Sequence, residues 1–234
     1  MKIGLHVPCY INELFPNVAK SSLLLLRTLG YNVSVPKNQT CCGQPFINGG
    51  YETTLPNLYE EIFKDFDYIL SPSSSCVSLI KSQHLAISDK TYELTDFLYL
   101  QKHLNLAKNR KPLILHNSCH SIRHLNLATP SELNMPYINK VKEVIGCETI
   151  QADRDECCGF GGVYSVKEGE MSYIMGKDKL NSLLSNWRYD FTPVITGVDM
   201  SCLMHLQGIA QKEGIKAEFK HICEILLESL NETL

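Results

Sequence analysis

Short apolar runs alternate along this chain with longer stretches in which apolar residues recur every three to four positions. The runs are partly β-branched and end near proline, glycine or cysteine, which is typical of strands, whereas the longer stretches have the periodicity of amphipathic helices. The pattern predicts strands at residues 2–7, 31–35, 68–70, 113–116, 148–151 and 194–196. It predicts helices at residues 17–29, 55–66, 139–145 and 169–186. Strands that alternate with helices in this way indicate parallel βαβ units.

The predicted elements occur twice in the same order. Each series closes with an amphipathic segment, at residues 94–104 and 219–230, which we expect to serve as packing faces between lobes. A polar stretch at residues 105–111, closed by Pro112, separates the two series. We therefore expect an α/β fold with two pseudo-symmetric parallel-sheet lobes from an internal duplication, spanning residues 1–108 and 109–234.

Cysteines repeat together with the elements. Cys-Cys-Gly occurs at residues 41–43 and again at 157–159, each time between an upstream and a downstream single cysteine. The first cysteine set is Cys9, Cys41, Cys42 and Cys76. The second cysteine set is Cys119, Cys157, Cys158 and Cys202. All eight follow predicted strands, and ligands of open α/β sheets gather beyond the carboxyl ends of strands, so we expect both sets to face a shared cleft.

The composition of the chain limits the partners, the compartment and the cysteine chemistry that we expect. The net charge of −3 and the pI of about 6.2 exclude a strongly basic surface, so we expect no nucleic-acid partner. No run approaches the roughly 20 apolar residues that span a bilayer, and the N-terminal residues lack a secretion signal. We expect a cytoplasmic protein without a membrane span. In that reducing compartment, ten cysteines indicate metal ligation or redox chemistry rather than disulfides.

Four thiolates per set favour an iron–sulfur cluster, with [4Fe-4S] as the expected type, because soft sulfur ligands complete such a cluster without help from histidine. Two alternatives stay open from the residues alone. Buried free cysteines are common in protein cores, although core packing explains neither the adjacent pairs nor their duplication. Zinc also binds thiolates, but the Cys-x2-Cys pairs that usually announce it are absent.

Other candidate residues lie close to the two sets. Three histidines flank the single cysteines and could act as metal ligands or as hydrogen-bond donors to the sulfurs: His6, His116 and His120. Three glycines would let the backbone approach a bound group: Gly159, Gly161 and Gly162. Cys147 and Cys223 have no counterpart in the other repeat, and we expect them to be structural.

The cysteine order and four local sequences, Pro-Cys-Tyr at 8–10, Cys-Cys-Gly-Gln-Pro at 41–45, His-Asn-Ser-Cys-His at 116–120 and Cys-Cys-Gly-Phe-Gly-Gly at 157–162, resemble the cysteine-rich CCG-domain family. That family includes the cysteine-rich chain of heterodisulfide reductase and iron–sulfur subunits of glycolate and glycerol-3-phosphate oxidation systems. The resemblance covers the whole chain and is nearest to the lactate-utilization members. It implies an iron–sulfur subunit of a cytoplasmic oxidoreductase complex that oxidises L-lactate to pyruvate. Both cysteine sets would hold clusters that carry electrons, and the partner subunits would include a ferredoxin-like iron–sulfur protein.

The chain departs from the fullest family pattern at two positions. That pattern ends each repeat in Cys-x-x-Cys and so supplies five thiolates to a non-cubane cluster that acts on disulfides. Here Ser73 and Asp199 occupy the first of those two cysteine positions, and either could donate an oxygen ligand. Two alternative functions follow: a thiol–disulfide reductase subunit of the heterodisulfide reductase kind, and a zinc-stabilised scaffold without turnover.

Overall fold

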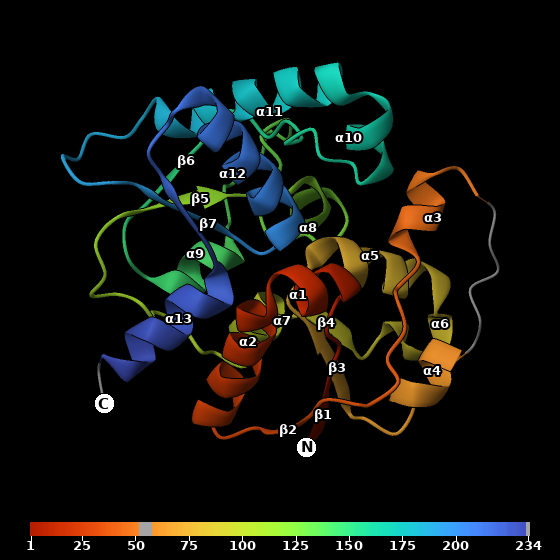
Figure 1. Cartoon of the computed structure of the whole chain (residues 1–234). Helices are drawn as coiled ribbons and strands as arrows, with labels where there is room; N and C mark the ends of the chain where they lie inside the picture. Colours follow the sequence, from red (N-terminus) through yellow and green to blue (C-terminus); the bar gives the residue numbers. More distant parts are fainter. Residues whose placement is uncertain (52–57, 233–234) are drawn as a thin grey trace.

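The computed structural model describes residues 1–51 and 58–232 and contains two four-stranded sheets (Figure 1). The strands of the first lobe are β1 (Lys2–Leu5), β2 (Asn32–Ser34), β3 (Tyr68–Ser71) and β4 (Thr91–Glu93). Those of the second lobe are β5 (Leu113–His116), β6 (Thr149–Gln151), β7 (Val194–Gly197) and β8 (Glu218–His221). The strand orders β2-β1-β3-β4 and β6-β5-β7-β8 are equivalent, and every pairing is parallel. The predicted α/β fold with two similar lobes is confirmed.

Thirteen helices are described around these sheets. The first lobe has α1 (Cys9–Leu14), α2 (Pro16–Thr28), α3 (Gln44–Asn48), α4 (Leu58–Phe63), α5 (Ser74–Gln83), α6 (Leu85–Ser88) and α7 (Leu94–Leu100). The second lobe has α8 (Cys119–Arg123), α9 (Lys140–Ile145), α10 (Val163–Lys167), α11 (Gly169–Leu184), α12 (Met200–Glu213) and α13 (Ile222–Asn231). Within the described ranges, each of these helices is too short or too polar to span a bilayer.

The helices predicted at residues 17–29, 139–145 and 169–186 correspond to α2, α9 and α11. The helix predicted at residues 55–66 is seen as α4, and the start of that prediction lies outside the described residues. The sequence pattern missed the edge strands β4 and β8, because they contain only three and four residues and β8 is only partly buried. Each of them runs directly into a helix. Their last residues, Glu93 and His221, accept hydrogen bonds from backbone N–H groups in the first turns of α7 and α13.

The closing helix of each lobe also packs against a helix of the other lobe. Helix α7 of the first lobe packs against α9 of the second, and α13 of the second packs against α2 of the first, as the adjacent blue and red helices in Figure 1 show. A single apolar core contains residues of all four helices, among them Leu26, Phe97, Val144 and Leu226. Each lobe therefore completes the core of the other, which agrees with the packing role expected for residues 94–104 and 219–230. The lobe boundary at residue 108 stays a prediction.

Candidate metal centre

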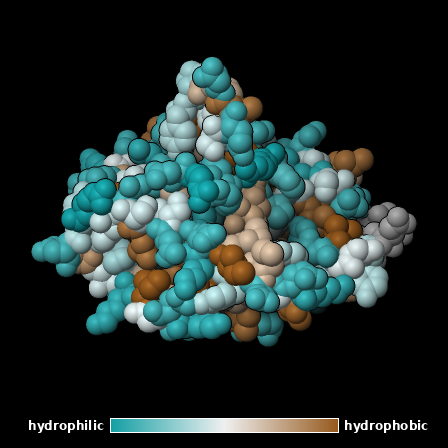
Figure 2. Space-filling view, turned by 90° about the horizontal axis from the view of Figure 1, so that it is seen from above, coloured by the Kyte–Doolittle hydropathy of each residue, from teal (hydrophilic) through white to brown (hydrophobic). Residues whose placement is uncertain are grey.

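All eight cysteines of the two sets line one cavity of about 400 Å³. Cys9 is exposed, and Val166 of α10 lines the same cavity while 84% exposed, so the cavity opens to the surface. Seen from the side of α10, α11 and α12, a band of apolar residues crosses the middle of a largely hydrophilic face (Figure 2). The expectation that both sets face a shared cleft agrees with this geometry.

The parallel sheets bring these cysteines together because equivalent residues follow equivalent strands. Cys9 and Cys119 are the first residues of α1 and α8, just beyond β1 and β5. Cys76 and Cys202 lie in the first turns of α5 and α12, which follow the central strands β3 and β7. The adjacent pairs lie in the loops after β2 and β6. Since the carboxyl ends of parallel strands meet at one edge of a sheet, the singles and the pair of each set converge there.

Each Cys-Cys-Gly loop turns at a glycine in the left-handed region, Gly43 with φ of 95° and Gly159 with φ of 85°. In this conformation the glycine N–H donates to the sulfur two residues earlier, Cys41 or Cys157, at 3.4 Å in both lobes. A side chain at Gly159 would also place its Cβ 2.6 Å from the carbonyl oxygen of Ser172 on α11. The loop thus requires glycine both for its turn and for its close approach to the helix.

The sulfurs of each set form a contiguous group. In the first set the Cys9 and Cys41 sulfurs lie 3.6 Å apart, and those of Cys42 and Cys76 lie 3.3 Å apart. Hydrogen bonds from the Cys42 and Cys9 thiols lower the pKa of Cys41 to about 2, while the same contacts raise the pKa of both donors. The neighbouring thiols thus favour the thiolate form of Cys41.

The second set repeats this arrangement. Hydrogen bonds from Cys119 and Cys158 lower the pKa of Cys157 to about 2, and Cys158 is linked in turn to Cys202. The thiolate is the form of cysteine that binds metals. Two equivalent groups of four sulfurs that could bind a metal thus line one cavity.

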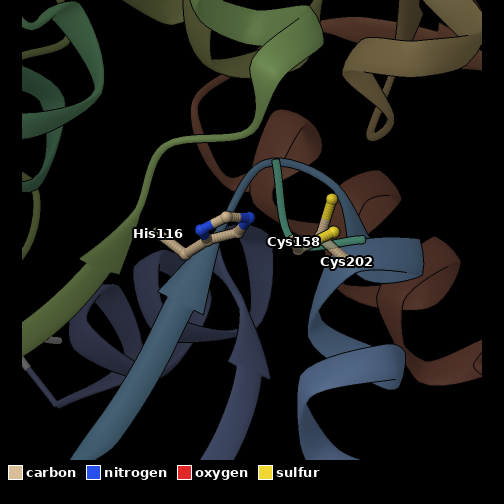
Figure 3. A group of neighbouring side chains, drawn as sticks. All are labelled: His116, Cys158 and Cys202. Carbon is tan, nitrogen blue, oxygen red and sulfur yellow. The ribbon is translucent and has the colours of Figure 1, made fainter. Parts of the chain in front are cut away.

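The two histidines that precede the single cysteines differ in their partners. His6 follows β1, and its Nδ1 pairs with the hydroxyl of Ser71 at 3.0 Å. His116 ends β5, but Gly197 stands where the first lobe has Ser71, and neither ring nitrogen of His116 has a hydrogen-bond partner among the described residues. Burial lowers the pKa of His6 to about 4 and that of His116 to about 3, so both rings are neutral. A ring nitrogen of His116 lies within 4.8 Å of the Cys158 and Cys202 sulfurs (Figure 3).

Ser73 and Asp199, where the fullest family pattern has cysteines, form a bridge between the lobes. Each caps the helix that follows it, with Ser73 accepting from Cys76 N–H and Asp199 accepting from Ser201 N–H. The buried Asp199 carboxylate also accepts from Ser75 N–H at 2.8 Å, the Ser74 hydroxyl at 3.0 Å and the Tyr10 hydroxyl at 3.1 Å, all in the first lobe.

Burial acts to raise the pKa of Asp199, but hydrogen bonds from Ser201 and Ser75 outweigh it and hold the pKa below its ordinary value. The backbones of Ser73 and Asp199 pair in an isolated antiparallel bridge. Both side chains are therefore engaged in holding the two lobes together.

The profile of the cysteine-rich domain family CCG matches residues 3–81 and 113–207. The chain belongs to the CCG family. It is 32% identical over 248 residues to lactate utilization protein A 1 of Bacillus mycoides (strain KBAB4), with 97% of each chain covered. It is 31% identical over 255 residues to lactate utilization protein A 2 of Bacillus cereus (strain AH820), covering 99% of this chain and all of the relative. Among solved structures, a candidate Asp/Glu racemase from Yersinia pestis covers 99% of this chain at 10% identity with a TM-score of 0.39.

Other predicted residues of this CCG protein divide between the cavity and the core. His120, Gly161 and Gly162 line the cavity. Cys147 and Cys223 lie away from it in the core shared by the lobes, in agreement with a structural role.

Sequence reasoning missed two residues near the cysteine sets. Tyr10 lines the cavity, and its place directly after Cys9 was a usable signal. Lys179 of α11 is buried below the second Cys-Cys-Gly loop, where its ammonium group donates to the Arg154 carbonyl at 2.7 Å. No local pattern marks Lys179, because its burial depends on how α11 packs in the fold.

The donor set of this CCG protein fits a bound metal. Soft thiolates select iron–sulfur clusters or zinc over hard cations, and here cysteines occur as two sets of four on one cavity. The unpartnered imidazole of His116 adds a nitrogen donor beside the second set. The residues therefore form a candidate metal-binding centre.

Proposed function

We propose that both cysteine sets hold iron–sulfur clusters of the [4Fe-4S] type, and that the protein is an electron-carrying subunit of a cytoplasmic complex that oxidises L-lactate to pyruvate. The observation that carries this proposal is the convergence of two equivalent groups of four thiols on one cavity. The names of the relatives from Bacillus mycoides and Bacillus cereus support the choice of lactate. The complex would include a ferredoxin-like iron–sulfur protein, and the chain is not expected to turn over alone.

A bound cluster would supply storage and transfer of single electrons. The residues of this chain hold and adjust it. The four cysteines of each set would be its ligands, namely Cys9, Cys41, Cys42 and Cys76 in one lobe and Cys119, Cys157, Cys158 and Cys202 in the other. The N–H groups of Gly43 and Gly159 already donate to the Cys41 and Cys157 sulfurs, and hydrogen bonds to ligating sulfurs influence a cluster's reduction potential.

One observation favours zinc as a second candidate. His116 lies beside the Cys158 and Cys202 sulfurs, and mixed nitrogen and sulfur ligands are typical of structural zinc sites. Zinc at this place would make the protein a scaffold without redox chemistry. We favour iron because the other lobe presents an equivalent group of four sulfurs, and among the described residues its flanking histidine, His6, forms no comparable group with them.

Metal analysis of protein purified without oxygen tests the proposal. We expect iron and acid-labile sulfide, and we expect the double variant Cys41→Ser with Cys42→Ser to lose about half of both, because only the first set is broken. The matched control, Cys147→Ala with Cys223→Ala, removes two buried cysteines outside the cavity and should keep the full iron content. Mixed with its partner subunits, the wild type should reduce a dye when lactate is added.

Other outcomes would contradict parts of this proposal. Loss of all iron from the Cys41→Ser and Cys42→Ser variant would show that the two sets build one shared site. A protein that contains zinc and no sulfide would refute the cluster. Disulfide reduction by the isolated chain would favour the heterodisulfide reductase alternative.

A further inference from the structure

His116 is a buried side chain whose polar atoms nothing in the described part of the protein satisfies. Its residue is 2% exposed, and both ring nitrogens lack a hydrogen-bond partner among residues 1–51 and 58–232. Leaving a buried polar group without a partner is costly, so such groups call for a specific explanation. The ring extends from the end of β5 toward the sulfurs of Cys158 and Cys202 (Figure 3).

The two lobes hold this histidine differently. In the first lobe Nδ1 of the equivalent His6 pairs with the Ser71 hydroxyl on the neighbouring strand, and only its Nε2 lacks a partner among the described residues. Gly197 takes the place of Ser71 in β7, and a Cβ there would lie 2.7 Å from the His116 carbonyl oxygen. The close pairing of β5 with β7 thus leaves no room for a serine, and His116 keeps both nitrogens available.

We propose that His116 is a nitrogen ligand of the metal group bound by the second cysteine set, a fifth donor that the first set lacks. This inference rests on the proposed function for the presence of a metal. One ring nitrogen and the sulfurs of Cys158 and Cys202 all lie within 4.8 Å of one another. Bonds of roughly 2.0 Å to nitrogen and 2.3 Å to sulfur would let His116 reach a metal atom held by Cys158 or by Cys202 after small side-chain adjustments. Neutral imidazole is the form that binds metals.

A nitrogen ligand would make the two sites different in redox behaviour. The added imidazole is neutral and replaces none of the four thiolates, so it would change the coordination of the second site without changing its charge. The buried Lys179 near Cys157 and Cys158 does change the charge around that site, since a nearby cation stabilises the more negative, reduced state. We therefore expect the second site to have the higher potential of the two and to hold the electron when one is present.

Pulsed electron paramagnetic resonance on the reduced, iron-loaded full chain tests the ligand. Protein grown with ¹⁵N-histidine is compared with unlabelled protein, and we expect a strong nitrogen coupling that changes with the isotope. The coupling should disappear in His116→Gln and persist in His6→Gln, the matched control at the equivalent position. If His116→Gln fails to retain iron, persistence of the isotope-sensitive coupling in His6→Gln, His120→Gln and His205→Gln, the other histidines that interact with cysteines of the two sets, still assigns it to His116.

Iron-loaded wild type without an isotope-sensitive coupling would overturn the inference and leave the proposed function standing. A coupling that survives in His116→Gln would overturn it as well. A protein that takes up zinc and no iron would refute the proposed function instead. The same isotope comparison on cobalt(II)-substituted protein would then decide whether His116 is a ligand.

Discussion

Removing the Asp199 carboxylate should loosen the contact between the lobes more than any other single polar change near the cavity. Asp199 is 2% exposed and accepts hydrogen bonds from four groups of the other lobe, those of Tyr10, Ser73, Ser74 and Ser75. It also accepts from the Ser201 hydroxyl at 2.6 Å within its own helix cap. The perturbation we propose is Asp199→Ala, with Asp199→Asn and Ser73→Ala as comparisons.

The expected size follows from these contacts. A hydrogen bond to a charged group contributes about 1.5–3 kcal/mol, but the bonds of one carboxylate are not additive, and Tyr10 faces the cavity, where water can replace its partner. Loss of the helix cap costs about 1 kcal/mol. We expect Asp199→Ala to lower the free energy of unfolding by about 3–5 kcal/mol. Asp199→Asn should cost less, because its amide oxygen still accepts. Ser73→Ala removes a helix cap of 3.4 Å and two equally long hydrogen bonds, to Asp199 and from Tyr10, and should cost about 1–2 kcal/mol.

Urea denaturation of the metal-free, reduced protein, followed by circular dichroism, measures these differences. Because the folded-state pKa of Asp199 is lowered, its contribution should be present at neutral pH and fade as the pH falls below the ordinary value of 3.8. The iron content of all three variants should stay at the wild-type level. An Asp199→Ala loss no larger than that of Ser73→Ala would refute the bridging role, and loss of iron from one lobe would make Asp199 a ligand.

Three further changes test the packing and electrostatics of the fold by urea denaturation. Gly146→Ala should destabilise by about 2–3 kcal/mol, because φ is 80° there and the new Cβ would meet backbone 2.4 Å away; equal stability would refute this. Gly176→Val should cost about 2–3 kcal/mol and lower iron binding in the second set alone, since its Cβ would lie 2.2 Å from the Ile209 side chain and 3.0 Å from the Cys158 carbonyl oxygen. Burial raises the pKa of Glu93 to about 8, so its contribution to stability is complete below 4.5 and is lost as the pH rises through 8. The free energy of unfolding of the wild type should therefore fall by about 3 kcal/mol relative to that of Glu93→Gln between pH 5 and pH 8. A difference between the two proteins that does not change with pH would contradict this.

Local patterns in the sequence predicted the strands whose side chains are buried at the centre of each sheet. Strands β1, β3, β5 and β7 were found because each is a continuous apolar run at the centre of its sheet. The spacing of the cysteines predicted their arrangement around one cavity. The edge strands β4 and β8 are short and contain charged residues in place of an apolar run, and only their pairing with β3 and β7 makes them strands.

The polar part of the site depended on contacts that no local pattern contains. Asp199 and Ser75 are 124 positions apart, and their bond exists only because the lobes face each other. The sequence marked His6 and His116 alike as residues near a cysteine. Their difference comes from Ser71 in one lobe and Gly197 in the other, which meet these histidines across neighbouring strands.

The packing of α7 and α13 against the opposite lobes has a consequence for the history of the chain. One repeat alone would leave the apolar faces of its first long helix and its closing helix uncovered. A second copy of the same repeat would cover both faces through the same contacts. Two identical copies of one repeat could therefore form the same helix contacts as the two lobes of this chain. In a homodimer a single gene dictates both sites, so a substitution in one is imposed on the other. Fusion removes that constraint, and only afterwards can one site keep a serine beside its histidine while the other acquires a glycine.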